Sequence, residues 1–241
     1  MSAFSLEEPL FTLAELGRRV GLPKATVYRL VTSLAARGFM VQAADGRYGL
    51  GVKLMEFGAV VRENLDIVQQ CAPVLDSLAA ATSETVLLAA VDWGERELVL
   101  VASRVSPHML SVISPVGRRQ KLPPGGALAR ALLAGLPPRE AKEIVRDLRM
   151  TASTPKTHVD RRLLLRDLEV ARELGYAAEQ DEYIDGVSGV AVPVVFEAGR
   201  PLAAIGVIGP SSRLGRELER LGALLCDGTK TLRPAERPTA A

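Results

Sequence analysis

Apolar residues near the start of the chain recur every three or four positions, which is the spacing of an amphipathic helix. The first apolar stripe runs from Leu13 to Val20. Thr12 and Glu15 have the spacing of a capping box, so this helix is predicted to begin after Thr12. Gly21 is expected to end it, because glycine adopts the left-handed C-terminal turn at little cost.

A second helix is predicted over residues 24–37, directly after Pro23, whose missing N–H is not needed in a first helical turn. Its predicted buried stripe is Val27, Leu30, Val31 and Leu34. Two short helices joined by a tight turn that contains glycine are typical of a helix-turn-helix. An ordinary helical hairpin with a solvated outer face would show the same pattern.

The outer side of the second helix carries side chains suited to DNA recognition. Lys24 and Arg29 can bond guanine edges or phosphates. Thr26 and Tyr28 can bond phosphates, and Ala25 can contact a thymine methyl group. The alternative for Arg29 is a salt bridge on the helix surface.

A small β-wing is predicted after the second helix. Residues 39–41 form a short apolar run, and residues 47–50 are expected to return as its partner strand. Asp45-Gly46 between them is a strong hairpin signal. This places Arg47 near the tip of the wing, where it can meet phosphate or the minor groove, and we include Tyr48 beside it among the DNA contacts.

The remaining pattern predicts helices and strands in alternation. The expected helices cover residues 51–64, 66–82, 127–134, 139–148, 159–174 and 213–225. The expected strands cover residues 86–91, 98–101, 110–113, 190–196 and 202–208, with hairpin turns at 92–95 and 197–200. Hairpins with helices before, between and after them favour an α+β fold, in which helices pack on one antiparallel sheet.

Charge is distributed unevenly along a chain whose net charge is only +2. Residues 1–62 hold eight Lys/Arg against five Asp/Glu, and the remainder is nearly neutral. A mildly basic module attached to a larger neutral domain suits a DNA reader joined to a sensor. Two cysteines, with no signal peptide or apolar membrane span, fit a reducing cytoplasm.

Several segments, in this order, resemble the isocitrate lyase regulator (IclR) family. They are GLPKATVYRLVTSLAARGFM, DGRYGLG, PVLDSLAAATSETVLLA, SPVGRRQKLPPGGALARALLA, GYAAEQDEYIDGVSGVAVPV and PLAAIGVIGP. The resemblance implies a winged helix-turn-helix followed by an effector-binding domain with a GAF/PAS-like sheet. MSAFSLEEPLF resembles only the tail of the family's first helix and the loop after it. Either the start codon was placed too late, which is the hypothesis that we favour, or the helix is missing.

The resemblance places an effector loop at the glycine-rich turn that leads into the helix at residue 127. The candidate residues there are Leu122, Gly125, Gly126 and Ala127. Free N–H groups at this helix start could hold a carboxylate, although a plain helix-start turn would look the same. Ala129 and Arg130 stand where the family usually has Gly-Lys, and Lys121 stands where it has Pro.

Two more segments match the family's effector pocket. In the acidic loop the candidates are Asp181, Glu182, Ser188 and Gly189, the last at a position where Cys is common. In the last strand Gly206 and Ile208 stand where small hydroxyl residues are frequent. Because those hydroxyls are lost, we expect a more apolar or larger effector than a small hydroxy- or keto-acid. A solvated acidic loop and a plain core strand are the alternatives.

The sequence gives no support for catalysis, metal binding or a cofactor. GVSGV lacks the final glycine of a nucleophile elbow, and His108 and His158 have no recognisable partners. The acidic loop does not follow the ligand order of calcium loops. We therefore predict that the protein is not an enzyme.

The resulting hypothesis is a cytoplasmic regulator that binds an operator in double-stranded DNA as a homodimer or homotetramer and responds to a small, partly apolar effector bearing a carboxylate. The predicted domains are a winged helix-turn-helix at 1–50, a linker helix at 51–64, an effector domain at 65–232 and a disordered tail at 233–241. The alternative is a protein–protein docking module with a vestigial effector domain.

Overall fold

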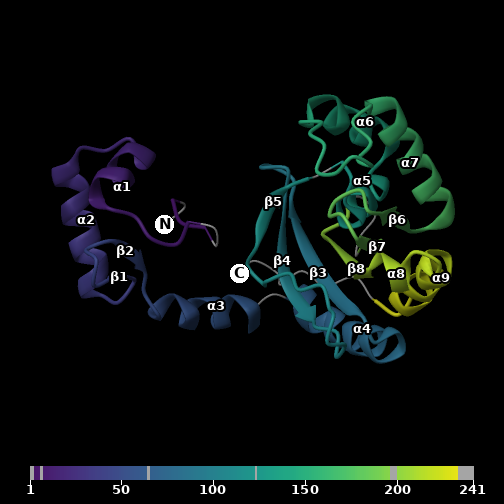
Figure 1. Ribbon diagram of the computed structural model, residues 1–241, viewed down its shortest axis with the longest axis horizontal. Coiled ribbons are helices and arrows are strands. Elements are labelled where there is room, and N and C mark those ends of the chain that lie inside the picture. Colours follow the sequence, from purple (N-terminus) through teal and green to yellow (C-terminus); the bar gives the residue numbers. More distant parts are fainter. Residues whose placement is uncertain (1–2, 6–7, 64–65, 123, 196–199, 233–241) are drawn as a thin grey trace, which may run out of the picture. The chain divides into compact units, whose positions relative to one another are not determined.

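The computed structural model describes residues 3–5, 8–63, 66–122, 124–195 and 200–232. The chain forms two compact units, Met1–Leu65 and Asp66–Ala241 (Figure 1). The predicted turn at 197–200 and the predicted tail at 233–241 fall wholly or largely outside the described residues. Among the helices in these ranges, none combines the length and apolar character needed to cross a membrane.

The first unit is a helix-turn-helix followed by a two-stranded wing. Its elements are α1 (Leu13–Val20), α2 (Lys24–Ala36), β1 (Met40–Gln42), β2 (Tyr48–Leu50) and α3 (Lys53–Glu63). The capping box is present: the Thr12 N–H donates to Glu15 Oε2 at 2.7 Å, and the Glu15 N–H donates to Thr12 Oγ1 at 3.3 Å. Gly21 ends α1 with a φ of 67°. The local predictions for this segment are therefore confirmed.

The core of the first unit is small. It contains Ala3, Phe11, Leu16, Val27, Val31, Met40 and Tyr48. The prediction that Leu30 is buried was wrong, because this side chain is 50% exposed. Val27 and Val31 pack in the core with Leu16 of α1, whereas Leu30 lies on the solvent side of α2.

The second unit is built on one antiparallel sheet of six strands in the order β5-β4-β3-β8-β7-β6. The strands are β3 (Thr85–Asp92), β4 (Glu97–Arg104), β5 (Arg119–Lys121), β6 (Ala177–Gln180), β7 (Val187–Val194) and β8 (Ala203–Pro210). The helices are α4 (Asp66–Thr82), α5 (Ala127–Ala134), α6 (Pro138–Asp147), α7 (Arg161–Leu174), α8 (Ser211–Leu214) and α9 (Leu218–Thr229). The predicted α+β fold, with helices flanking an antiparallel sheet, is confirmed.

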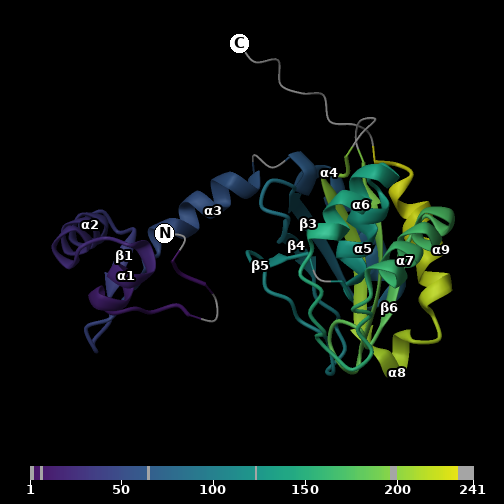
Figure 2. The same cartoon turned by 90° about the horizontal axis from the view of Figure 1, so that it is seen from above.

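Helices cover both faces of this sheet because alternate strand residues are apolar on each side. On one face, Leu87 and Ala191 pack in the core that contains α5, and α6 and α7 lie next to α5 (Figure 2). On the other face, Leu88 and Val192 pack against α4 and α9. The cavity described below lies on the α5 side.

Three secondary-structure predictions for this unit were wrong. Residues 110–113 are not a strand, because β5 occupies the edge of β4 with Leu98 opposite Gln120. The short strands β5 and β6 were both missed. The single closing helix is two helices, α8 and α9, and α8 ends at Gly215, where a Cβ would stand 2.8 Å from the Ser211 carbonyl oxygen.

Candidate functional site

The outer face of α2 presents the side chains that were singled out for DNA contact. Lys24, Ala25, Tyr28 and Arg29 are exposed, and Thr26 is half-buried. Val27 and Val31 hold the opposite face in the core. Neither Lys24 nor Arg29 makes an ion pair within the described residues. Both cations are therefore open to an anionic partner.

Only one of the two wing residues lies on the surface. Arg47 is exposed at the tip, where its Nε lies 2.7 Å from Asp45 Oδ2. The backbone N–H of Arg47, and then this side-chain contact, lower the pKa of the Asp45 carboxyl. Tyr48 is a correction to the predicted DNA contacts: its backbone pairs with Phe11 and its side chain is buried in the core of the unit.

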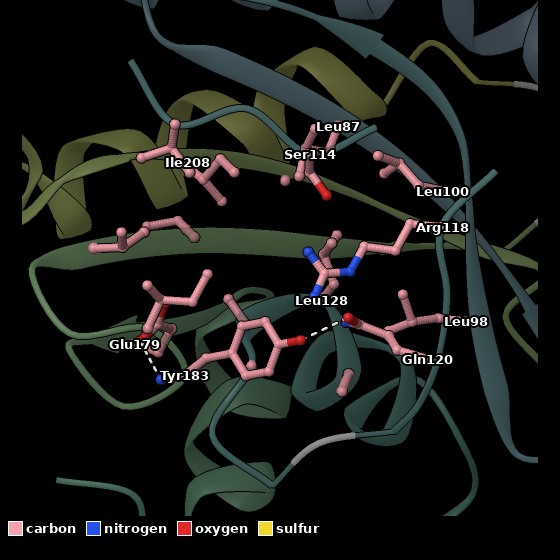
Figure 3. A pocket seen from close by; sticks show the side chains of 18 of the residues that line it. Leu87, Leu98, Leu100, Ser114, Arg118, Gln120, Leu128, Glu179, Tyr183 and Ile208 are labelled. Carbon is pink, nitrogen blue, oxygen red and sulfur yellow. Dashed lines mark hydrogen bonds between the residues drawn. The ribbon is translucent and has the colours of Figure 1, made fainter. Parts of the chain in front are cut away.

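A cavity lies in the second unit between the sheet and the start of α5 (Figure 3). Its volume, measured as space open to the centre of a water molecule, is about 80 Å³. Most of the wall is apolar and includes Leu87, Leu98, Leu100, Val112, Ile113, Leu128, Val187 and Ile208. Such a cavity suits a small organic molecule with an apolar body.

Four of the predicted effector residues line this cavity: Gly126, Ala127, Gly206 and Ile208. Gly126 precedes α5, and no side chain caps the N-terminus of that helix. The missing side chain of Gly206 adds no space to the cavity. A Cβ there would stand 3.0 Å from Leu128 Cδ2, so the Leu128 side chain already fills the space.

The other six candidates do not line the cavity, and structural contacts account for the polar ones. Asp181 accepts hydrogen bonds from Lys156 Nζ (2.6 Å) and Ser211 Oγ (2.5 Å). Glu182 pairs with Arg130, and Ser188 Oγ donates to Ser211 Oγ at 2.9 Å.

The three apolar candidates outside the cavity are held by packing. Leu122 is buried in the core beside α5. Gly125 passes so close to the backbone of Glu182 that a Cβ would stand 2.6 Å from its carbonyl oxygen. Gly189 lies on β7 opposite Glu179, next to the cavity wall.

The polar groups of the cavity were missed as site residues by the sequence analysis. Arg118, Gln120, Glu179 and Tyr183 come from segments up to 65 residues apart, and their side chains surround the cavity in Figure 3. Tyr183 donates its hydroxyl proton to Gln120 Oε1 at 2.6 Å. The available signal was local: a glutamate that follows two alanines in a short strand, and polar residues directly after the Gly117 turn.

Arg118 is the cavity's cation. Its side chain is half-buried, and Figure 3 shows the guanidinium pointing into the cavity. No carboxylate within the described part of the chain forms an ion pair with it. Burial raises the pKa of the Tyr183 hydroxyl, and the positive charge of Arg118 opposes that shift. An unpaired cation in an apolar wall favours an anionic ligand.

Glu179 is the cavity's carboxyl group, and its side chain is deeply buried. Burial raises its pKa from 4.5 to about 7, although the backbone N–H groups of Glu182 and Tyr183 lower it. Both N–H groups donate to Oε2, at 3.0 and 3.4 Å. Oε1 has no hydrogen-bond partner among the described residues.

A buried ion network lies behind the cavity. Arg130, at the position where the family's lysine was expected, is 3% exposed. Its guanidinium forms a two-pronged pair with Glu182 and donates to the Pro124 carbonyl at 2.9 Å. Asp167 Oδ2 lies 3.4 Å from Arg130 and 3.1 Å from His158 Nδ1. Arg130 therefore holds the acidic loop against α5 and does not enter the cavity.

Ser188, the serine of GVSGV, is not part of a catalytic triad within the described residues. Ser188 bonds Ser211, whereas His158 pairs with Asp167 on α7. No cluster of three or more His, Cys, Asp or Glu side chains suited to a metal ion occurs in the ranges that the structure describes.

Comparison with known proteins matches both units. Residues 1–44 match the IclR helix-turn-helix domain, and residues 59–231 match the bacterial transcriptional regulator IclR C-terminal domain. The HTH-type transcriptional repressor AllR of Escherichia coli strain K12 is 32% identical over 204 residues, which is 84% of this chain and 74% of that protein.

Solved structures agree. An IclR transcriptional regulator from Alicyclobacillus acidocaldarius is 25% identical, with a TM-score of 0.83 over 95% of this chain and 91% of that one. An IclR homologue from Microbacterium hydrocarbonoxydans, complexed with 4-hydroxybenzoate, is 24% identical and shares the fold, with a TM-score of 0.75 over 95% and 94%. AllR and the Alicyclobacillus protein are both named as transcriptional regulators. The chain belongs to the IclR family of bacterial transcriptional regulators.

Proposed function

We propose that this IclR-family regulator represses transcription by binding an operator through α2 and the wing, and that a small effector in the α5-side cavity controls this binding. The observation that carries the proposal is the exposed, unpaired pair of cations on α2, Lys24 and Arg29, in a unit of the helix-turn-helix family. Cations and aromatics on a recognition helix supply both phosphate and base contacts. A protein that reads chromosomal DNA would act in the cytoplasm.

The operator is proposed to be a pseudo-palindrome bound by a homodimer or homotetramer. Two recognition helices on one face of DNA require half-sites separated by whole helical turns. The apolar side chains of Val52, Met55 and Phe57, at and beside α3, are exposed, which supports a contact between two copies. Their burial in a dimer would remove apolar surface from water.

The effector is proposed to be small, partly apolar and to bear a carboxylate. The apolar wall supports the first two properties. The uncapped N-terminus of α5 supports the third, because its free N–H groups attract anions. The 4-hydroxybenzoate bound to the Microbacterium homologue is a molecule of this kind.

The proposal is tested by fluorescence anisotropy of the protein on duplexes that tile its own upstream region, at two salt concentrations. We expect tight binding to one duplex, resistance to competitor DNA, and an affinity that falls steeply with salt because phosphate contacts release counterions. Equal, weak binding to every duplex would contradict the proposal. Binding to a protein partner with little salt dependence would support the docking-module alternative.

A further inference from the structure

Resting on the proposed function, we infer that Arg118 selects effectors with a single carboxylate, and that Glu179 receives an uncharged hydroxyl or carbonyl group at the other end of the same molecule. The effector class is thus a monocarboxylic acid with an apolar body and one distal polar group. Its charge would be recognised by a side chain, in addition to the N-terminus of α5.

The argument for Arg118 rests on its place and its lack of a partner. Arg118 follows Gly117, whose φ of 90° turns the chain directly before β5. In β5 neighbouring residues face opposite ways. Arg118 and Gln120 line the cavity, whereas Arg119 points out and pairs with Glu97 at 2.8 Å. Figure 3 shows the Arg118 guanidinium in the same part of the cavity as Leu128 of the α5 first turn. A carboxylate bound there would pair with the Arg118 guanidinium and accept from the free N–H groups at the N-terminus of α5.

The argument for Glu179 rests on a free atom in a buried group. The side chain is 6% exposed, and Oε2 is bonded twice to backbone N–H groups, whereas Oε1 is unpartnered within the described residues. When this carboxyl is protonated, its proton belongs on Oε1, which then donates to a carbonyl oxygen. When it is ionised, Oε1 accepts from a hydroxyl group. Gly189 lies opposite and leaves Oε1 uncovered.

Together these groups disfavour two ligand types. An uncharged amide leaves Arg118 without an anion, which costs binding because a half-desolvated cation stays unpaired. A dicarboxylate brings a second anion close to Glu179, and no cation within the described residues is paired with the Glu179 carboxyl. Glu179 would then have to stay protonated, which weakens binding wherever it is otherwise ionised.

The test uses calorimetric binding of matched probes to the full-length protein: benzoate, phenylacetate and 4-hydroxybenzoate, the three corresponding amides, and terephthalate as the dicarboxylate. We expect at least one acid to bind at least about tenfold more tightly than its amide, because a hydrogen bond between two charged groups is stronger than one between neutral groups. 4-Hydroxybenzoate should bind more tightly than benzoate and terephthalate.

The variants are Arg118→Gln and Arg118→Lys, with Arg119→Gln as the matched control for loss of one charge from β5. In Arg118→Gln the affinities for an acid and its amide should differ by no more than about threefold. Arg118→Lys should keep part of the preference for the acid, and Arg119→Gln should keep all of it. Circular dichroism establishes that each variant is folded.

Three results would overturn the inference: no acid binds the wild type, acid and amide bind equally, or Arg118→Gln keeps the full preference. Operator binding is measured separately. A protein that binds its operator but shows any of these results refutes the effector class and leaves the regulator function standing. A wild-type protein that prefers acids over amides but binds no operator would refute the proposed function instead.

Discussion

Gly189 on β7 lies so close to Glu179 on β6 that a Cβ at Gly189 would stand 3.6 Å from Glu179 Oε1. The same Cβ would stand 3.2 Å from Ile208 Cγ2, on the cavity side of β8. The missing side chain therefore keeps the free oxygen of Glu179 accessible, and this relationship leads to the first prediction.

Gly189→Ala should weaken effector binding by roughly fivefold or more, because the added methyl group covers Glu179 Oε1. The free energy of unfolding should change by about 1 kcal/mol or less. Calorimetry with the tightest-binding acid measures the first effect, and urea denaturation measures the second. Gly94→Ala, in the exposed turn between β3 and β4, is the control. Unchanged affinity in Gly189→Ala would show that the ligand does not reach Glu179.

Glu179 should make folding stability depend on pH. Its folded-state pKa of about 7 lies above the unfolded value of 4.5, so the native state holds the proton more tightly. Stability from this group is therefore greatest below pH 4.5, falls as pH rises toward 7 and is level above it. As the pH rises from 4.5 to about 7, the wild type should lose up to about 3 kcal/mol of folding stability relative to Glu179→Gln.

Chemical denaturation of the wild type and Glu179→Gln at matched pH values, from about pH 4.5 to about pH 8, tests this sign. The difference between the two curves isolates Glu179 from the other carboxyl groups. A difference that is flat with pH, or that grows in favour of the wild type, would contradict a buried neutral carboxyl.

The buried pair of Arg130 and Glu182 should contribute strongly to the stability of the second unit. Arg130→Met should destabilise it by about 3–5 kcal/mol, because Glu182 then stays buried without its cation. The double variant with Glu182→Gln should recover part of the loss. Arg166→Met, an exposed change on α7, should cost less than about 0.5 kcal/mol. Urea denaturation gives all three values, and a cost near that of Arg166→Met would refute the role assigned to Arg130.

The two cations of α2 should act differently on DNA binding. Arg29→Ala should reduce the free energy of operator binding by about 1–3 kcal/mol and weaken the preference for one particular base pair, as expected for a base contact. Lys24→Ala should weaken binding to all duplexes alike and reduce the salt slope by about 1, as expected for a phosphate contact.

Anisotropy titrations on the operator and on single-base variants distinguish these patterns, with Arg166→Ala as the control for charge in the other unit. If Arg29→Ala weakens every duplex equally, Arg29 binds phosphate and the base contact must come from another residue.

Features that depend on neighbouring residues were predictable from the sequence. The capping box of Thr12 and Glu15, the left-handed Gly21 and the Asp45-Gly46 turn involve atoms a few positions apart, so the same chemistry operates wherever the segment lies in the fold. The helix from Asp66 to Thr82 followed from its apolar spacing in the same way.

The tertiary structure decided which residues meet. A strand forms only where a partner edge is free. Strand β4 pairs with Arg119–Lys121, so residues 110–113 form no strand, and Val112 and Ile113 line the cavity instead. Burial depends on what covers a face, so Tyr48 is in the core and Leu30 is in solvent. Arg118 and Glu179, two of the polar residues that line the cavity, come together only when separate strands and α5 close around it. No local interaction links positions so far apart in the chain.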